Sequence, residues 1–277
     1  EVNTRVDLES LLKGIIIQSG NDASVAVAEH IAGTEATFAE LMNQYARELG
    51  MADTHYTNAA GLPDPEHYST AADTARLVQA LIERFPDYYD YYSQRAFTWN
   101  DIEQFNRNRM LWQDETVDGV KTGYTETAGY CLATSADRDG MRLISVVMGA
   151  DNPGARVEQS KALLNYGYRF FETHRLYAAG EAIETPRIWK GQADNLPVGV
   201  TQDLFVTIPA RAYDRLDARL ALDGQIEAPV DAGEPVGRLA VTIGDETVTE
   251  QDIVALETIA EGGIISRVID ELLLWLE

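Results

Sequence analysis

The sequence predicts an α+β fold: a mainly helical first part, an antiparallel sheet with a covering helix, and a separate small all-β domain followed by a helix. Three observations predict it. Apolar residues recur at helical spacing through most of the first 115 residues, short β-like runs between Gly- and Asp-bearing turns follow, and further short β-like runs replace the helical spacing beyond Leu176. The expected domains are residues 1–173, residues 174–262 and an amphipathic helix over residues 263–277.

Four helices are expected in the first part. The first runs from Asp7 to Gln18 and stops at a turn-forming triplet, Ser19-Gly20-Asn21. Asp22 is expected to cap the second helix, which ends at Gly33, since a short acidic side chain can accept hydrogen bonds from free N–H groups. The remaining two are expected over Glu35–Leu49 and Ala71–Arg84.

Three strands are expected next, over Thr116–Thr122, Ala128–Ser135 and Met141–Gly149. Their short connections imply antiparallel pairing. A long helix after Pro153 must then cover one face of the sheet, because its apolar residues recur at helical spacing as far as Phe171.

The last hundred residues read as a β domain and one helix. The expected strands are Leu204–Ile208, Leu216–Leu222, Val236–Ile243 and Ile253–Glu257. On the expected C-terminal helix, one side carries the apolar residues Ile265, Val268, Ile269, Leu272 and Leu276.

Composition excludes several classes of function. The 45 acidic and 22 basic residues give a formal charge of −23, which repels nucleic-acid phosphates, so we expect no nucleic-acid partner. The four histidines lack metal-ligand spacing, and the single cysteine, Cys131, excludes an internal disulfide. We therefore expect no metal and no cofactor.

Two short motifs are candidates for a catalytic or binding site. Ser19-Gly20-Asn21 follows the first helix, and Lys121-Thr122-Gly123 ends the first strand of the sheet, 102 residues later. Each alone also fits an ordinary turn. Lys121 is one of only four lysines, and the glycine after Thr122 lets a ligand approach the strand backbone closely.

In this order, the two motifs match the second and third elements of the penicillin-recognising serine enzymes, S-x-x-K, S-x-N and K-T-G. The chain resembles the low-molecular-mass penicillin-binding proteins, serine-type D-alanyl-D-alanine carboxypeptidases of the penicillin-binding protein 5/6 type. The likeness includes Asn106-Arg107-Asn108 and extends into the β domain. It implies that residues 1–173 form a β-lactamase/DD-peptidase-like transpeptidase domain that lacks its N-terminal part.

The resemblance also implies roles for particular residues. A serine attacks the penultimate D-alanine of a peptidoglycan stem peptide, the terminal D-alanine leaves, and water releases the acyl-enzyme; β-lactams acylate the same serine. Ser19, Asn21 and Lys121 match the catalytic positions. The substrate-binding positions are Lys121, Thr122, Gly123, Tyr124 and Arg107, with the Tyr124 N–H as oxyanion-hole donor.

The attacking serine has no match in this chain. The family's S-x-x-K lies roughly sixty residues before S-x-N, whereas only eighteen residues precede Ser19. The one S-x-x-K present, Ser10 to Lys13, falls on the helix that leads into Ser19, with Ser10 about 13 Å away along the axis. We expect a longer native N-terminus and no activity from this chain alone.

Two other functions remain open at this point. One is a class A-like β-lactamase, disfavoured by Gly20 in the second motif and by the C-terminal β domain. The other is a non-catalytic remnant that binds peptidoglycan or a partner. The resemblance implies a periplasmic or extracytoplasmic location. Two roles stay open for the C-terminal helix: a peripheral contact with the outer face of the inner membrane, or packing on the β domain.

Overall fold

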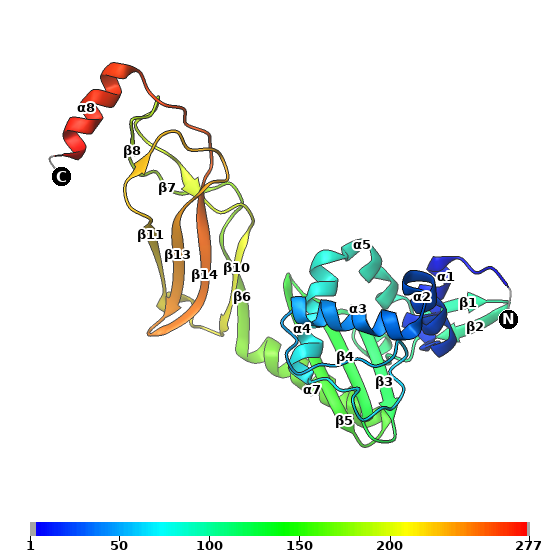
Figure 1. Cartoon of the computed structure of the whole chain (residues 1–277). Helices are drawn as coiled ribbons and strands as arrows, with labels where there is room; N and C mark the ends of the chain where they lie inside the picture. The colour runs from blue at the N-terminus through cyan, green and yellow to red at the C-terminus, as the bar shows by residue number, and fades with distance from the viewer. Residues whose placement is uncertain (1–3, 276–277) are drawn as a thin grey trace. The chain divides into compact units, whose positions relative to one another are not determined.

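A computed structural model gives the fold and describes residues 4–275 (Figure 1). The chain divides into two compact units, Glu1–Tyr168 and Arg169–Glu277. The first combines helices with a three-stranded sheet, and the second is built mainly of short strands. The predicted α+β class is confirmed.

The predicted helices of the first unit are present. Thr34 and Thr70 cap two of them, each accepting a hydrogen bond from the backbone N–H three residues later. Asp22 was wrongly expected to cap a helix: that helix begins one residue earlier, at Asn21, with Gly20 as its N-cap. The helical segments before the sheet are α1 (Leu8–Lys13), a π-helical segment (Gly14–Gln18), α2 (Asn21–Ala32), α3 (Glu35–Glu48), α4 (Ala71–Arg84), α5 (Pro86–Tyr89), a 3₁₀ turn (Asp90–Ser93) and α6 (Met110–Gln113).

The predicted antiparallel sheet is confirmed. Its strands are β3 (Val117–Thr125), β4 (Gly129–Arg138) and β5 (Met141–Ala150), in the order β3-β4-β5. A two-residue turn at Asp139-Gly140 joins β4 to β5, and both residues have positive φ, 54° and 84°. The hairpin of β1 (Ala96–Trp99) and β2 (Ile102–Phe105) precedes the sheet.

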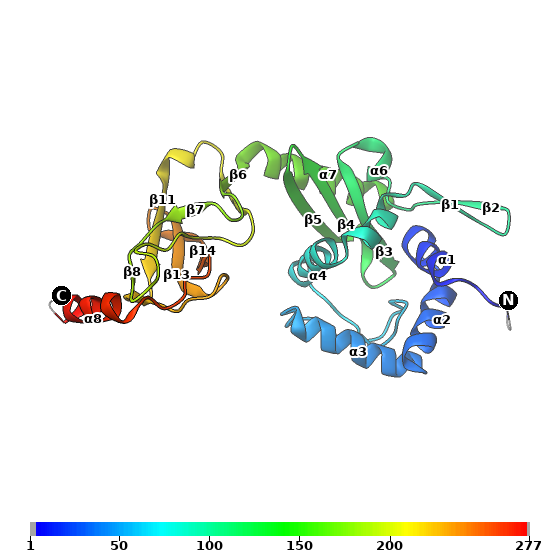
Figure 2. The same ribbon diagram turned by 90° about the horizontal axis from the view of Figure 1, so that it is seen from above.

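Helices cover both faces of the sheet (Figure 2). On one face, Leu132 of β4 packs with Val157 and Leu164 of α7 (Pro153–Phe170), as predicted for that helix. On the other face, Val78 of α4 packs with Ile144 of β5. Within its sheet β3 has one neighbour, β4, and therefore forms an edge.

The second unit has its own core, which includes Leu196, Val206, Leu239 and Ile253. Its larger sheet has the order β11-β13-β14-β9-β7, and β6 pairs with β10 separately. The strands are β6 (Phe171–Tyr177), β7 (Ala182–Glu184), β8 (Ile188–Trp189), β9 (Val198–Gly199), β10 (Leu204–Pro209), β11 (Leu216–Leu222), β12 (Ile226–Glu227), β13 (Pro235–Ile243) and β14 (Glu246–Ala255); a 3₁₀ turn covers Tyr213–Arg215.

The predicted C-terminal helix is α8 (Ile264–Leu274). Val268, Ile269 and Leu272 on it are exposed. Of its other predicted apolar positions, Leu276 and the side chain of Ile265 lie outside the described residues. Within residues 4–275, no helix is long and apolar enough to cross a membrane.

Candidate active site

The two motifs meet. The Lys121 ammonium donates a hydrogen bond to the Ser19 hydroxyl and another, of 2.9 Å, to the carbonyl of Thr122. The residues that form the first contact are 102 positions apart in the chain. The fold thus brings the end of the π-helical segment against the edge strand β3.

Ser19 has an unusual backbone conformation. It follows the π-helical segment with φ 61° and ψ 49°, in the left-handed region that residues with a Cβ seldom adopt. Gly20 then returns to extended φ and ψ, and α2 begins at Asn21. π-helical turns and left-handed non-glycine residues both concentrate at functional sites, where the surrounding structure stabilises the strain.

Lys121 titrates far below a free lysine. Burial lowers its pKa most, and the nearby Arg107 and Arg156 lower it further, to about 8. A cation surrounded by two guanidinium groups is a suitable binding site for an anion such as a carboxylate. The same group can also lose its proton within reach of neutral pH.

Two buried asparagines hold Arg107. Asn106 donates to the carbonyl of Gln94 at 3.0 Å, and Asn108 donates to the carbonyl of Gly119 at 2.9 Å. Between them, Arg107 is exposed, and its Nε lies 3.4 Å from the Gln18 side-chain oxygen. The link from Asn108 to Gly119 ties this segment to β3 two residues before Lys121.

Arg156 belongs to the same cluster, and sequence reasoning missed it. From α7, its guanidinium donates to the carbonyls of Gly123 and Cys131, at 3.0 and 3.2 Å, while its Nε is buried without a hydrogen-bond partner among the described residues. One signal was available: Arg156 lies on the buried face of α7, one turn before Ser160. A charged residue on the core-facing side of a helix indicates a polar partner or a function.

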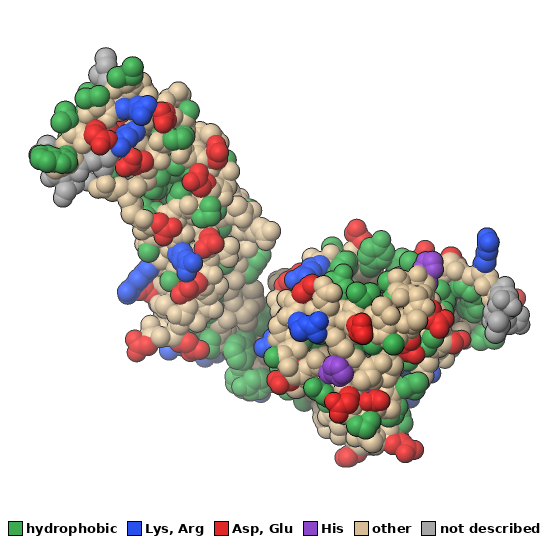
Figure 3. Space-filling view, in the orientation of Figure 1, with side chains coloured by type: hydrophobic (Ala, Val, Ile, Leu, Met, Phe, Trp, Pro, Cys, Tyr) green, Lys and Arg blue, Asp and Glu red, His purple; other side chains and the backbone are tan. Residues whose placement is uncertain are grey.

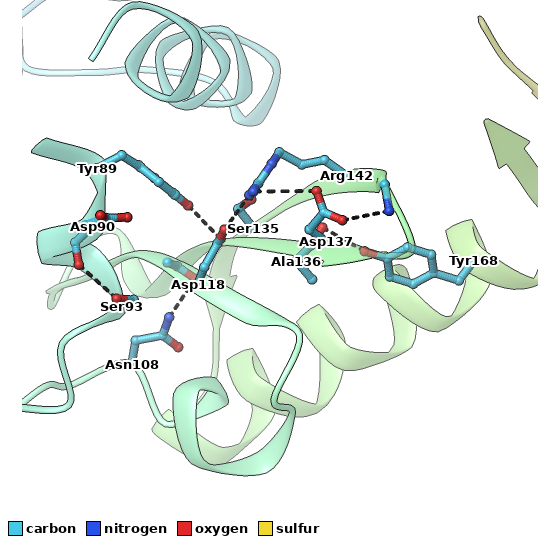
Figure 4. A network of polar contacts seen from close by, with 12 residues as sticks. Tyr89, Asp90, Ser93, Asn108, Asp118, Ser135, Ala136, Asp137, Arg142 and Tyr168 are labelled. Carbon is cyan, nitrogen blue, oxygen red and sulfur yellow. Dashed lines mark hydrogen bonds and ion pairs between the residues drawn. The ribbon is translucent and has the colours of Figure 1, made fainter. Parts of the chain in front are cut away.

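A polar network supports β3 directly before the motif (Figure 4). The Asp118 carboxylate accepts hydrogen bonds from the Tyr89 hydroxyl at 2.9 Å and from Arg142 at 2.6 Å. Arg142 also donates to Ser135 of β4 at 2.7 Å. The network therefore joins α5, β3, β4 and β5 three residues before Lys121.

The other predicted site residues have varied surroundings. Thr122 is buried, whereas Asn21 and Gly123 are exposed, and no described residue forms a hydrogen bond with the Asn21 side chain. Tyr124 is 55% exposed and stacks on Tyr130 across the sheet. Among residues 4–275, no group of three His, Cys, Asp or Glu side chains could hold a metal ion.

An antiparallel sheet with Lys-Thr-Gly on its edge strand, a helix on each face, and a Ser-x-Asn turn against the lysine define the class of penicillin-recognising serine enzymes. Residues 1–152 match the D-alanyl-D-alanine carboxypeptidase family, Peptidase S11, and residues 171–261 match the C-terminal domain of penicillin-binding protein 5. The chain belongs to the D-alanyl-D-alanine carboxypeptidase family, whose members are serine-type hydrolases that act on peptidoglycan outside the cytoplasm.

Relatives cover both units. D-alanyl-D-alanine carboxypeptidase DacD of Escherichia coli is 40% identical over 269 residues, which are 96% of this chain and 69% of the relative. The structure of penicillin-binding protein 5 from Haemophilus influenzae is 38% identical with a TM-score of 0.85, over 94% of this chain and 77% of the other. The ampicillin-bound penicillin-binding protein D2 of Listeria monocytogenes is 30% identical with a TM-score of 0.56, over 60% and 70%. The match of the β domain favours a carboxypeptidase over a β-lactamase.

Proposed function

We propose that this chain supplies the substrate-binding and proton-relay side of a D-alanyl-D-alanine carboxypeptidase site, and that the attacking serine lies outside residues 1–277. One observation carries the proposal: the hydrogen bond between Ser19 and Lys121, from motifs distant in the sequence. β-Lactams, which imitate the D-alanyl-D-alanine terminus, are expected to enter the same site.

Carboxylate recognition follows from the charges. At pH 7 Lys121 is mainly protonated, because its pKa is about 8, and two guanidinium groups lie near it. The terminal carboxylate of the stem peptide binds Lys121, with help from Arg107 and the Thr122 hydroxyl. Charge-assisted hydrogen bonds of this kind are roughly twice as strong as neutral ones.

Proton transfer and oxyanion binding complete the assignment. The attacking serine adds its oxygen to the penultimate carbonyl and gives its proton to a base that lies, like the serine, outside residues 1–277. The C–N bond to the terminal D-alanine then breaks, while the Ser19 hydroxyl gives its proton to the departing nitrogen and takes up the proton held by that base. Asn21 binds the substrate amide. Since β3 is an edge strand, alternate backbone N–H groups point away from the sheet, and that of Tyr124 is our oxyanion donor.

Ser10 is a poor nucleophile. Its S-x-x-K partner, Lys13, forms an ion pair of 2.6 Å with Glu9 and lies over the Tyr91 ring, 5.2 Å from its centroid. The Lys13 ammonium therefore bonds Glu9, and among the described residues it forms no hydrogen bond with the Ser10 hydroxyl. We therefore place the nucleophile on another segment, in the open hollow of about 1300 Å³ that Gln18, Gly20 and residues of α1, α2, β1 and β2 line.

Labelling with a fluorescent penicillin, followed by peptide mapping, tests the assignment. We expect no covalent adduct on this chain alone. An adduct on Ser10 or Ser19 would overturn the location of the nucleophile. Intact mass of the native protein and the coding sequence before Glu1 give an independent check, because a mature protein that starts at Glu1 contradicts the longer native chain.

We also propose a peripheral membrane contact through α8, on the outer face of the inner membrane. Asp270 pairs with Arg187 at 3.0 Å and Glu271 with Lys190 at 2.6 Å, so charged side chains of α8 bind the β domain. Val268, Leu272 and Trp275 are exposed, and Figure 3 shows apolar side chains at this end of the second unit. Apolar side chains on the outward side of a helix suit a lipid interface.

Vesicle co-sedimentation tests this contact with the full chain and with a chain ending at residue 262. We expect the full chain alone to bind. Equal sedimentation of the two chains would eliminate the membrane role of α8.

A further inference from the structure

Arg156 reaches the strand β3 from α7, the helix that covers one face of the sheet. It is 9% exposed, and its guanidinium lies 5.5 Å from the centroid of the Tyr130 ring. One of its nitrogens, Nη1, donates to the carbonyls of Gly123 and Cys131, at 3.0 and 3.2 Å. A buried, charged donor is therefore held on two carbonyls of the sheet.

These two carbonyls show how β3 is oriented at the end of the Lys-Thr-Gly motif. Gly123 and Cys131 are partners across the β3–β4 ladder. If their carbonyls pointed away from each other, the strand spacing and both C=O bonds would separate the oxygens by more than about 7 Å. One nitrogen could not reach both, so the two carbonyls face the space between β3 and β4.

The peptide group that Arg156 binds also carries the oxyanion donor. The peptide bond between Gly123 and Tyr124 is trans, so its C=O and its N–H point in opposite directions. Because the carbonyl faces β4, the N–H faces the outer edge of β3, where a substrate can bind. Arg156 thus holds one end of the peptide group whose other end is the Tyr124 N–H.

Arg156 approaches β3 from the face opposite to the Lys121 side chain. Lys121 pairs with Ala133, which packs with residues of α4, whereas Leu132, the residue before Ala133, packs on α7. Successive side chains of a strand point to opposite faces of the sheet. Arg156 therefore acts on the site through the backbone of β3 and not by contact with the substrate.

A charged donor on the Gly123 carbonyl affects the Tyr124 N–H in two ways. It fixes the plane of the peptide group, so that the N–H keeps its direction toward the reacting carbonyl. It also draws electron density toward the Gly123 oxygen, which makes the N–H a stronger donor, because linked hydrogen bonds polarise one another. Both effects stabilise negative charge that develops on the substrate oxygen.

We propose that Arg156 is a positioning residue of the oxyanion hole: it orients and polarises the Gly123–Tyr124 peptide group, so that the Tyr124 N–H binds the developing oxyanion more strongly. This inference rests on the proposed function, because it takes the Tyr124 N–H as the oxyanion donor. It gives a residue of the covering helix α7 an effect on the chemical step.

A peptide with one labelled carbonyl tests the inference by NMR. The ligand is Nα-acetyl-L-lysyl-D-alanyl-D-alanine with carbon-13 in the carbonyl of its penultimate residue, titrated with the whole chain at pH 7. The titration curve gives the dissociation constant, and the limiting downfield shift of the bound peptide reports how strongly this carbonyl is polarised. Affinity and polarisation are thereby measured separately.

Three variants carry the test. Arg156→Met should still bind the peptide, with a limiting shift smaller by about 10–30%, the estimated strengthening between linked hydrogen bonds. Arg156→Gln, a polar replacement without charge, should also reduce the shift. Arg95→Met is the matched control: it removes an arginine that donates to another backbone carbonyl, that of Leu111 at 2.9 Å, and should leave the limiting shift unchanged.

A second label follows the Gly123 carbonyl in the free chain. With carbon-13 in the glycine carbonyls and nitrogen-15 in the tyrosines, the correlated signals come from Gly123-Tyr124, Gly129-Tyr130 and Gly167-Tyr168. In Arg156→Met the Gly123 carbonyl resonance should move upfield. Gly167 lies near the end of α7, and its unchanged resonance shows that this helix is still folded.

The outcomes separate the two proposals. Peptide binding by Arg156→Met with an unchanged limiting shift overturns the inference and leaves the proposed function standing. An unchanged Gly123 resonance does the same, as does an equal loss of the limiting shift in Arg95→Met, since removal of any arginine would then explain it.

Loss of peptide binding in both Arg156 variants also contradicts the inference, because a role in the oxyanion hole leaves carboxylate binding intact. If the unaltered chain binds no peptide, the assignment of this chain as the substrate-binding side fails, and the role of Arg156 fails with it.

Discussion

Lys121 determines how the site responds to pH. Burial and the neighbouring guanidinium groups bring the pKa of Lys121 to about 8, so the charge of this lysine changes close to the neutral range. A lowered lysine pKa means that the proton is held below about pH 8 and lost above it. A bound carboxylate favours the protonated form and raises this midpoint.

We therefore predict that binding of Nα-acetyl-L-lysyl-D-alanyl-D-alanine weakens about tenfold between pH 7 and pH 9.5, as one charge-assisted hydrogen bond is lost. Calorimetry across this range gives the profile. In Lys121→Met, binding should be weak at pH 7 and change little with pH. A flat profile in the unaltered chain would show that Lys121 does not bind the carboxylate.

Motif residues could be predicted from sequence, whereas the residues that set their chemistry could not. Ser19 and Lys121 belong to recognisable triplets, but Arg156 reaches the same cluster only because α7 packs under β3 and β4. The left-handed backbone conformation of Ser19 could not be predicted from the sequence either. A Ser-Gly pair suggests the left-handed conformation at the glycine, yet Ser19 adopts it and Gly20 has φ −67°.

At the scale of elements, the strand β3 carries most of the site, and its position depends on Asp118. This carboxylate is about one-third exposed and accepts hydrogen bonds from both Tyr89 and Arg142. Burial raises the pKa of Tyr89, so its hydroxyl stays a donor throughout the neutral range. Loss of the carboxylate leaves two donors without their partner.

We predict that Asp118→Ala lowers the free energy of unfolding by about 2 kcal/mol, the usual cost of unsatisfied groups in a charged network. Urea denaturation measures it. Asp217→Ala is the matched control, since its ion pair with Arg219 is also 2.6 Å long but exposed, and its loss should cost less than about 0.5 kcal/mol. Equal effects would contradict a bracing role for Asp118.

Long helices and strands were easier to predict than short strands. The apolar spacing of α4 and α7 and the runs of β3, β4 and β5 reflect burial on one or both faces. The hairpin of β1 and β2 lies in a stretch that was expected to be mainly helical, and its four-residue strands carry too few alternations to reveal it. β6 follows α7 without a break, so no turn signal marks its start.

At the scale of the whole molecule, the sequence indicated a change from helical to β texture, and the structure divides at Tyr168 and Arg169. The acidic excess is not concentrated in one segment, and Figure 3 shows acidic side chains on both units. Charge therefore does not distinguish the units. Their cores do: each buried apolar cluster draws its residues from one unit alone.

Separate cores predict separate unfolding. Leu164 in the first unit and Leu239 in the second are each 1% exposed. Truncation of such a leucine to alanine typically lowers the free energy of unfolding by about 2–5 kcal/mol, which is a large share of the total stability of a small domain. We predict two calorimetric unfolding transitions. Leu239→Ala should lower the midpoint temperature of one of them, and Leu164→Ala should lower that of the other. Each variant serves as the control for the other. A single transition whose midpoint temperature falls in both variants would contradict this prediction, because the two units would then unfold together.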